Sequence, residues 1–126
     1  MALLLCTNAI SQNANTWKGG TPGLENDWNC AKNWSAYRVP DAFTDVIIPD
    51  VSTTTQSPPV IQSGQMEVNS LFLETNAELT IEKSAQLVVF DPTCSFIPKN
   101  VGGKGDLFLL NTPQVYQAST ASAFRN

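Results

Sequence analysis

Three apolar pairs recur every eight residues in the middle of the chain, and this repeat constrains the fold more than any other feature. One residue separates the two members of each pair, so both side chains point to the same side of a strand. Small or turn-tolerant residues, Asn76-Ala77 and Ser84-Ala85, separate the pairs. Short strands of one length joined by such corners predict a β-solenoid. The apolar positions are Leu71, Leu73, Leu79, Ile81, Leu87 and Val89.

An antiparallel β-sandwich or meander is the alternative, because an eight-residue spacing also occurs there. Hairpins of that kind usually carry Asn-Gly or Asp-Gly at their turns. Neither dipeptide occurs in this sequence, and eight scattered prolines leave no room for a long helix. We therefore expect an all-β chain that forms a short parallel solenoid.

A single coil of these strands buries too little apolar surface to be stable by itself, so it has to stack on neighbouring coils. Val46 and Ile48, just before Pro49, and the pair Val60-Ile61 look like strands of an earlier coil. We expect Val46 and Ile48 to join the six octad residues in one core, and residues 44–110 to form the solenoid body.

Three tryptophans, Trp17, Trp28 and Trp34, precede the first expected strand. A tryptophan buries a large area, and one placed at the end of a solenoid would cover the exposed apolar layer. Residues 12–43 are therefore interpreted as an N-terminal cap.

Short motifs follow one another in a fixed order across the cap and the first strands: T-W-x-G, D-W-x-x-A-x-N-W, V-P, D-V-I-I-P, P-V-I and then the x-A-x-L-x-[I/V] octads. In this order they resemble the N-terminal part of secreted β-helix modules in large Bacteroidetes surface proteins. The resemblance covers about residues 16–90. It implies the start of a right-handed parallel β-helix, an extracellular or cell-surface setting and a role in adhesion. It also implies structural roles in the cap for Asn33 and Asp45.

The first eleven residues allow two interpretations. The apolar run Ala2-Leu3-Leu4-Leu5-Cys6 is followed by Ala9-Ile10-Ser11, which has the A-x-S form of a signal-peptidase site. A basic n-region and a full apolar core are missing, so residues 1–11 are either a signal-peptide remnant or an N-terminal strand. No stretch approaches the ~20 apolar residues of a membrane span, and none is expected.

The three cysteines lie at positions 6, 30 and 94. If residues 1–11 are removed, Cys30 and Cys94 remain as an even pair that could form a disulfide between cap and body. If they are retained, Cys6 is left over. The spacings fit no zinc pattern, and the sequence contains no histidine.

Composition argues against several functions. Without histidine a Ser-His or Cys-His dyad is impossible. Seven basic and eleven acidic residues give a net charge of −4, which disfavours nucleic-acid binding. Glu78 and Glu82 occupy outward positions, which is more typical of solvated surface than of a paired-carboxylate hydrolase. We expect no catalytic activity and no cofactor.

Calcium is a further possibility at the cap. Asp27, Asp41 and Asp45 could converge on an ion together with backbone carbonyl groups. Hydrogen bonds that cap turns are an equally good role for these side chains. We expect no bound metal.

The chain beyond the cap suggests how the protein acts. Charged residues make up 14% of the sequence, so it is polar through Ser, Thr, Asn and Gln, a balance that suits exported β proteins. A solenoid has open strand edges, and open edges recruit strands. A candidate assembly strand lies just before and within the polar tail 111–126. Its residues are Leu107, Leu109, Val115 and Tyr116.

We therefore expect a non-catalytic extracellular structural protein, a subunit of a surface fibre or layer that assembles with copies of itself through β-edges. The partners could also be other surface proteins or glycans. One alternative is a monomeric adhesive or carbohydrate-binding module, or a fragment of a larger adhesin, in which the outward Phe72 contacts the sugar. A virion surface protein is a weaker alternative.

Overall fold

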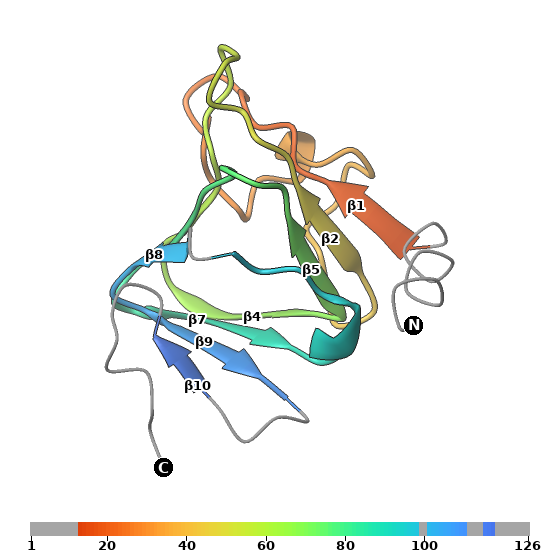
Figure 1. Ribbon diagram of the computed structural model, residues 1–126. Coiled ribbons are helices and arrows are strands. Elements are labelled where there is room, and N and C mark those ends of the chain that lie inside the picture. The colour runs from red at the N-terminus through yellow and green to blue at the C-terminus, as the bar shows by residue number, and fades with distance from the viewer. Residues whose placement is uncertain (1–12, 99–100, 111–114, 118–126) are drawn as a thin grey trace.

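The computed structural model describes residues 13–98, 101–110 and 115–117 as a coil of parallel strands with a looped cap (Figure 1). The two helical elements in this part of the chain are single 3-10 turns. In chain order the elements are β1 (Ala14–Thr16), η1 (Ala31–Asn33), β2 (Asp45–Ile48), β3 (Val60–Ile61), β4 (Gly64–Val68), β5 (Ser70–Leu73), β6 (Leu79–Ile81), β7 (Ala85–Val89), η2 (Pro92–Cys94), β8 (Val101–Gly103), β9 (Asp106–Leu109) and β10 (Val115–Gln117).

The strands form three sheets, which are the three faces of a β-solenoid of about three turns. Sheet A has the order β1-β2-β5, sheet B has the order β3-β6-β8, and sheet C has the order β4-β7-β9-β10. Every strand pair in sheets A and B is parallel, and in sheet C the pair β9–β10 is antiparallel. The predicted parallel solenoid is confirmed, and the antiparallel sandwich is wrong.

The three octads form one turn of this coil. They become β5, β6 and β7, which belong to sheets A, B and C in that order. Between β2 and β9, a residue on one strand pairs with a residue 20 to 25 positions further along the chain. The eight-residue repeat of the sequence therefore corresponds to one face of the coil, whereas the structure itself repeats once per turn of three faces. Asn76, at the corner between β5 and β6, has a φ of 71°, which asparagine tolerates better than most residues.

The core fills the space between the three sheets. Leu71 and Val46 are neighbours across sheet A, Ile81 lies beside Ile61 in sheet B, and the pattern continues in sheet C. The structure buries the eight apolar residues expected in the core, each at most 1% exposed: Val46, Ile48, Leu71, Leu73, Leu79, Ile81, Leu87 and Val89. In the described residues no helix is long and apolar enough to cross a membrane.

Replacing Leu87 by alanine tests the stacked core. Leu87 is fully buried on β7, between β4 and β9. We expect Leu87→Ala to lower the free energy of unfolding by about 2–5 kcal/mol, because it removes apolar contacts and leaves a cavity. Urea unfolding followed by circular dichroism measures this. The neighbour Gln86 is not fully buried, so Gln86→Ala should change the free energy of unfolding by no more than about 0.5 kcal/mol. Equal losses of stability in the two variants would contradict the stacked core.

Candidate functional site

The N-terminal end of the coil is closed by the three tryptophans of the cap. Trp17, Trp28 and Trp34 are each at most 1% exposed. The ring of Trp34 lies between the other two, with centroid distances of 5.1 Å to Trp17 and 4.8 Å to Trp28, and both pairs meet edge to face. This geometry is favourable for aromatic rings and fills the end of the core with a rigid plug.

Two of the indole groups are anchored by hydrogen bonds. Trp17 Nε1 donates to the carbonyl oxygen of Ser57 at 2.7 Å, and Trp34 Nε1 donates to that of Trp28 at 2.8 Å. The first bond ties the cap to the loop that leads into β3. Trp28 Nε1 is buried and finds no acceptor among the described residues.

Asn33 holds the loop that surrounds the plug. Its Nδ2 donates to the carbonyl oxygens of Leu24 at 2.7 Å and of Asp27 at 3.0 Å. Its Oδ1 accepts from the backbone N–H of Thr21 at 3.0 Å and from the Thr21 hydroxyl at 2.6 Å. A fully buried amide with all these partners is a structural element of the cap.

The cap also closes two of the three sheets. In sheet A, the outer edge of β1 exchanges hydrogen bonds with Ser35, because Thr16 N donates to Ser35 Oγ and Ser35 N donates to the Thr16 carbonyl. In sheet B, Val60 of β3 accepts from Trp28 N and donates to the carbonyl of Asn26. In sheet C, no strand of the described chain pairs with the outer edge of β4.

The direction of the backbone groups in β4 follows from its bonds to β7. Gly64 N donates to the Ser84 carbonyl, and the Val68 carbonyl accepts from Phe90 N, so these residues face β7. Backbone groups alternate along a strand, and the N–H groups of Gln65 and Glu67 therefore point to the free edge. The strand contains neither lysine nor proline, which often protect such edges, and Glu67 is its one charged residue.

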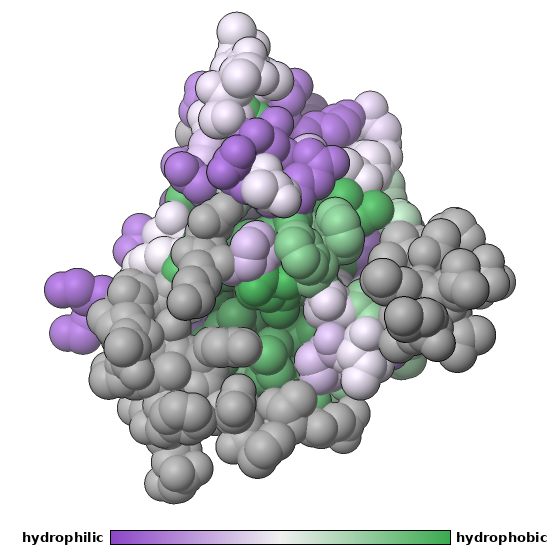
Figure 2. All heavy atoms as spheres, viewed as in Figure 1, coloured by the Kyte–Doolittle hydropathy of each residue, from purple (hydrophilic) through white to green (hydrophobic). Residues whose placement is uncertain are grey.

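The opposite end of the coil has no comparable plug in the described residues. Sheet B ends at β8, sheet C ends at β10, and sheet A ends at the backbone of Phe96, which bonds to Leu71 and Leu73. Phe96 and Leu110 are 46% and 39% exposed. In Figure 2, hydrophobic atoms gather in the middle of the face turned to the viewer, below the polar upper lobe.

The residues of the expected assembly strand lie in two different strands. Leu107 is buried and Leu109 is partly buried in β9, which lies between β7 and β10. Val115 and Tyr116 belong to β10, where the backbone pairs with Phe108 and Leu107. Among the described strands, the outermost one at this end of sheet C is therefore β10, and β9 is an internal strand.

The expected disulfide between Cys30 and Cys94 is wrong, because the thiol of Cys30 is free. Cys30 precedes η1 in the cap, whereas Cys94 lies in η2, after the turn that β7 completes. A disulfide requires Cα atoms within about 7 Å. An even cysteine count does not supply that proximity. Cys6 lies outside the described residues.

The three aspartates considered for calcium accept hydrogen bonds from the protein itself, and two of them cap turns. Asp27 and Asp41 each accept a hydrogen bond at 2.9 Å from the backbone N–H two residues ahead. Asp45 Oδ1 is buried and accepts from Ser70 Oγ at 2.6 Å and from Asn69 Nδ2 at 2.9 Å, which joins β2 to the start of β5. No group of three potential metal ligands occurs in the described chain.

Phe72, the residue considered for sugar contact, packs against another ring. It lies on sheet A beside Phe96, with ring centroids 5.5 Å apart, and is half-buried. This contact is the packing role that a lone outward phenylalanine usually has.

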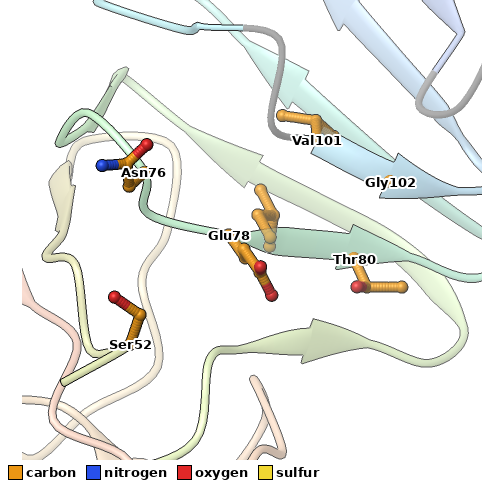
Figure 3. Close-up of a pocket in the computed structure, with 7 residues that line it drawn as sticks. Ser52, Asn76, Glu78, Thr80, Val101 and Gly102 are labelled. Carbon is orange, nitrogen blue, oxygen red and sulfur yellow. The ribbon is translucent and has the colours of Figure 1, made fainter. Parts of the chain in front are cut away.

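A groove of about 460 Å³ lies along sheet B, and several polar side chains surround it (Figure 3). The sequence indicated Glu78 as solvated surface and Asn76 as a corner residue, and it singled out neither Ser52 nor Thr80. These residues lie in segments about one turn apart, and a glycine inside a strand is the one signal that could have indicated the place. The lining residues are Ser52, Asn76, Glu78, Leu79, Thr80, Val101 and Gly102.

A family model described as "Domain of unknown function (DUF8693)" matches residues 16–119. The chain belongs to this family. No curated protein and no solved structure matches the chain. The DUF8693 match begins at the last residue of β1 and continues past β10, so the cap, the coil and both outer strands of sheet C are parts of one family domain.

Replacing Asn33 by alanine tests the cap of this DUF8693 domain. The change removes the four hydrogen bonds of a fully buried amide, two to the carbonyl groups of Leu24 and Asp27 and two from Thr21, and we expect the free energy of unfolding to fall by about 2–4 kcal/mol. Thermal unfolding followed by tryptophan fluorescence reports on the plug directly. Asn29 is exposed, and Asn29→Ala should leave the transition unchanged; an Asn33→Ala protein as stable as the parent would contradict the role of the amide.

Proposed function

We propose that this chain is a non-catalytic structural protein that assembles end to end through sheet C into an extracellular fibre or surface layer. The observation that carries the proposal is that, among the described strands, the outer edge at each end of sheet C has no pairing partner. The edge of β4 lies at the cap end and the edge of β10 at the other end, whereas the cap covers the edges of sheets A and B.

Two different edges favour an open chain of copies. A contact between the β10 edge of one copy and the β4 edge of the next is heterologous, and such contacts build filaments when they do not close into a ring. β10 runs antiparallel to β9, while β4, β7 and β9 are parallel to one another. A next copy stacked in the same sense would therefore meet β10 in the antiparallel mode, which is slightly the more stable pairing per residue.

Side chains at the ends agree with this arrangement. Apart from Glu67, the β4 edge carries no charge that would repel an incoming strand. Phe96 and Leu110 lie at the end that the next copy would cover, and their burial would add apolar stabilisation to the backbone hydrogen bonds.

An extracellular setting is supported by the sequence. The cap motifs resemble those of secreted surface modules, and the low content of charged residues suits an exported β protein. The A-x-S pattern at residues 9–11 adds to this argument.

Glu67→Pro tests the assembly edge. Because the N–H of Glu67 points away from β7, proline removes no bond of the sheet but blocks an incoming strand. The preceding Met66 lies within the strand, as a residue before proline prefers. We expect the parent to form concentration-dependent assemblies in light scattering and fibres or sheets in negative-stain micrographs, and Glu67→Pro to remain monomeric.

Glu67→Gln is the matched control. It removes the same charge but keeps the N–H group, and it should assemble at least as well as the parent. Circular dichroism checks that both variants are folded. A parent protein that stays monomeric over a wide concentration range, or a folded Glu67→Pro variant that assembles normally, would refute assembly through this edge.

A further inference from the structure

We propose that the groove on sheet B is a binding site for a neutral saccharide unit. The groove lies along one side of the coil and not at an end, so this inference does not depend on the assembly proposed above. A volume of about 460 Å³ lies within the range of small-ligand sites and accommodates one or two sugar rings.

The first support is a set of polar side chains that are accessible to a ligand. Asn76 and Glu78 are exposed and Thr80 is half-buried, and none of the three side chains makes a hydrogen bond to another described residue. Figure 3 shows Asn76 at the corner before β6, Glu78 just before this strand and Thr80 on it. Together they offer a carboxylate, a hydroxyl and an amide on one side of the groove.

The second support is Gly102, in the middle of β8. A Cβ atom there would meet nothing within 4 Å, so packing does not require glycine at this position. Its neighbour Gly103 differs, because it has a φ of +90° and a Cβ there would collide with the backbone of Ile81. Glycine weakens a strand interior and is often found where a ligand approaches the backbone closely. Gly102 keeps the floor of the groove open.

The third support is the way in which the rim is held. Ser52 N donates to Asp50 Oδ1 at 2.9 Å. Hydrogen bonds from the Ser52 side chain and from its backbone lower the pKa of the Asp50 carboxyl. Asp50 is therefore ionised at neutral pH and keeps Ser52 beside the groove. On the other side of the rim, the left-handed conformation of Asn76 fixes the corner from which its amide projects.

The charges of the lining select the class of ligand. Among the described residues that line the groove, Glu78 is the single charged one, and none of them is a lysine or arginine. A carboxylate accepts hydrogen bonds from two neighbouring hydroxyl groups, and charge-assisted bonds of this kind are the stronger ones. The amide and hydroxyl groups can donate to and accept from further hydroxyl groups. An anionic sugar would be repelled by Glu78, so the ligand is a neutral saccharide with adjacent hydroxyl groups.

Titration of the full chain with free sugars, together with a glycan array, tests the inference. The probes are glucose, galactose, mannose and N-acetylglucosamine, with glucuronic acid as the anionic comparison. We expect at least one neutral sugar, free or as part of an arrayed glycan, to bind with a dissociation constant on the order of 1 mM. Glucuronic acid should bind at least about 10-fold more weakly. If free sugar does not inhibit binding to an arrayed glycan, the groove recognises a saccharide longer than one unit.

Two groove variants and one control make the result specific. Glu78→Gln should weaken binding by at least about 10-fold, the effect of losing a charge-assisted hydrogen bond. Gly102→Val should abolish binding by filling the floor, while the thermal transition stays where it was. Glu82 is exposed and does not line the groove, so Glu82→Gln should bind like the parent.

Three results would overturn the inference: no binding of any neutral sugar or glycan, preference for the anionic sugar, or full binding in both Glu78→Gln and Gly102→Val. Should Gly102→Val fail to fold, Glu78→Gln decides the question alone. Assembly measured in the same samples reports separately on the edge of β4.

Discussion

The stacking of one turn on the next is the interaction on which this structure depends. Val46 and Leu71 in sheet A, and Ile61 and Ile81 in sheet B, are neighbours because successive strands are parallel and in register. Each turn buries its apolar side chains only when another layer lies against it. Only at the two ends of the coil does a layer of apolar side chains lack a neighbouring turn, so each end needs a cover of another kind.

The cap covers one end with two kinds of interaction. The edge-to-face tryptophans fill the end of the core, and hydrogen bonds from the cap loops occupy the edges of β1 and β3. Asn33 holds the loop around the plug through its buried amide. No described strand of the cap pairs with β4, so the described part of sheet C ends at the edge of β4 on the capped side and at the edge of β10 on the other side. The coil therefore has two unlike ends, and its sides are available for other contacts.

The regular part of the fold was predictable, and the irregular part was not. Alternation in the octads identified β5, β6 and β7 and their inward side chains, because strand periodicity is a local property. A disulfide between Cys30 and Cys94 was a wrong prediction, because counting cysteines carries no information about distance. Ser52 and Gly102 had no visible relation in the sequence, yet they line one groove with Glu78.

Neighbouring side chains and their hydrophobicity were enough to predict which residues point inward, where the corners lie and that tryptophans cover an end. Only the folded coil shows that the three octads share one turn and which of the described strands pair. The physical reason is that partners in this coil lie 20 to 25 residues apart from β2 onwards. Their register depends on the lengths and conformations of all the corners between them, which no local pattern encodes.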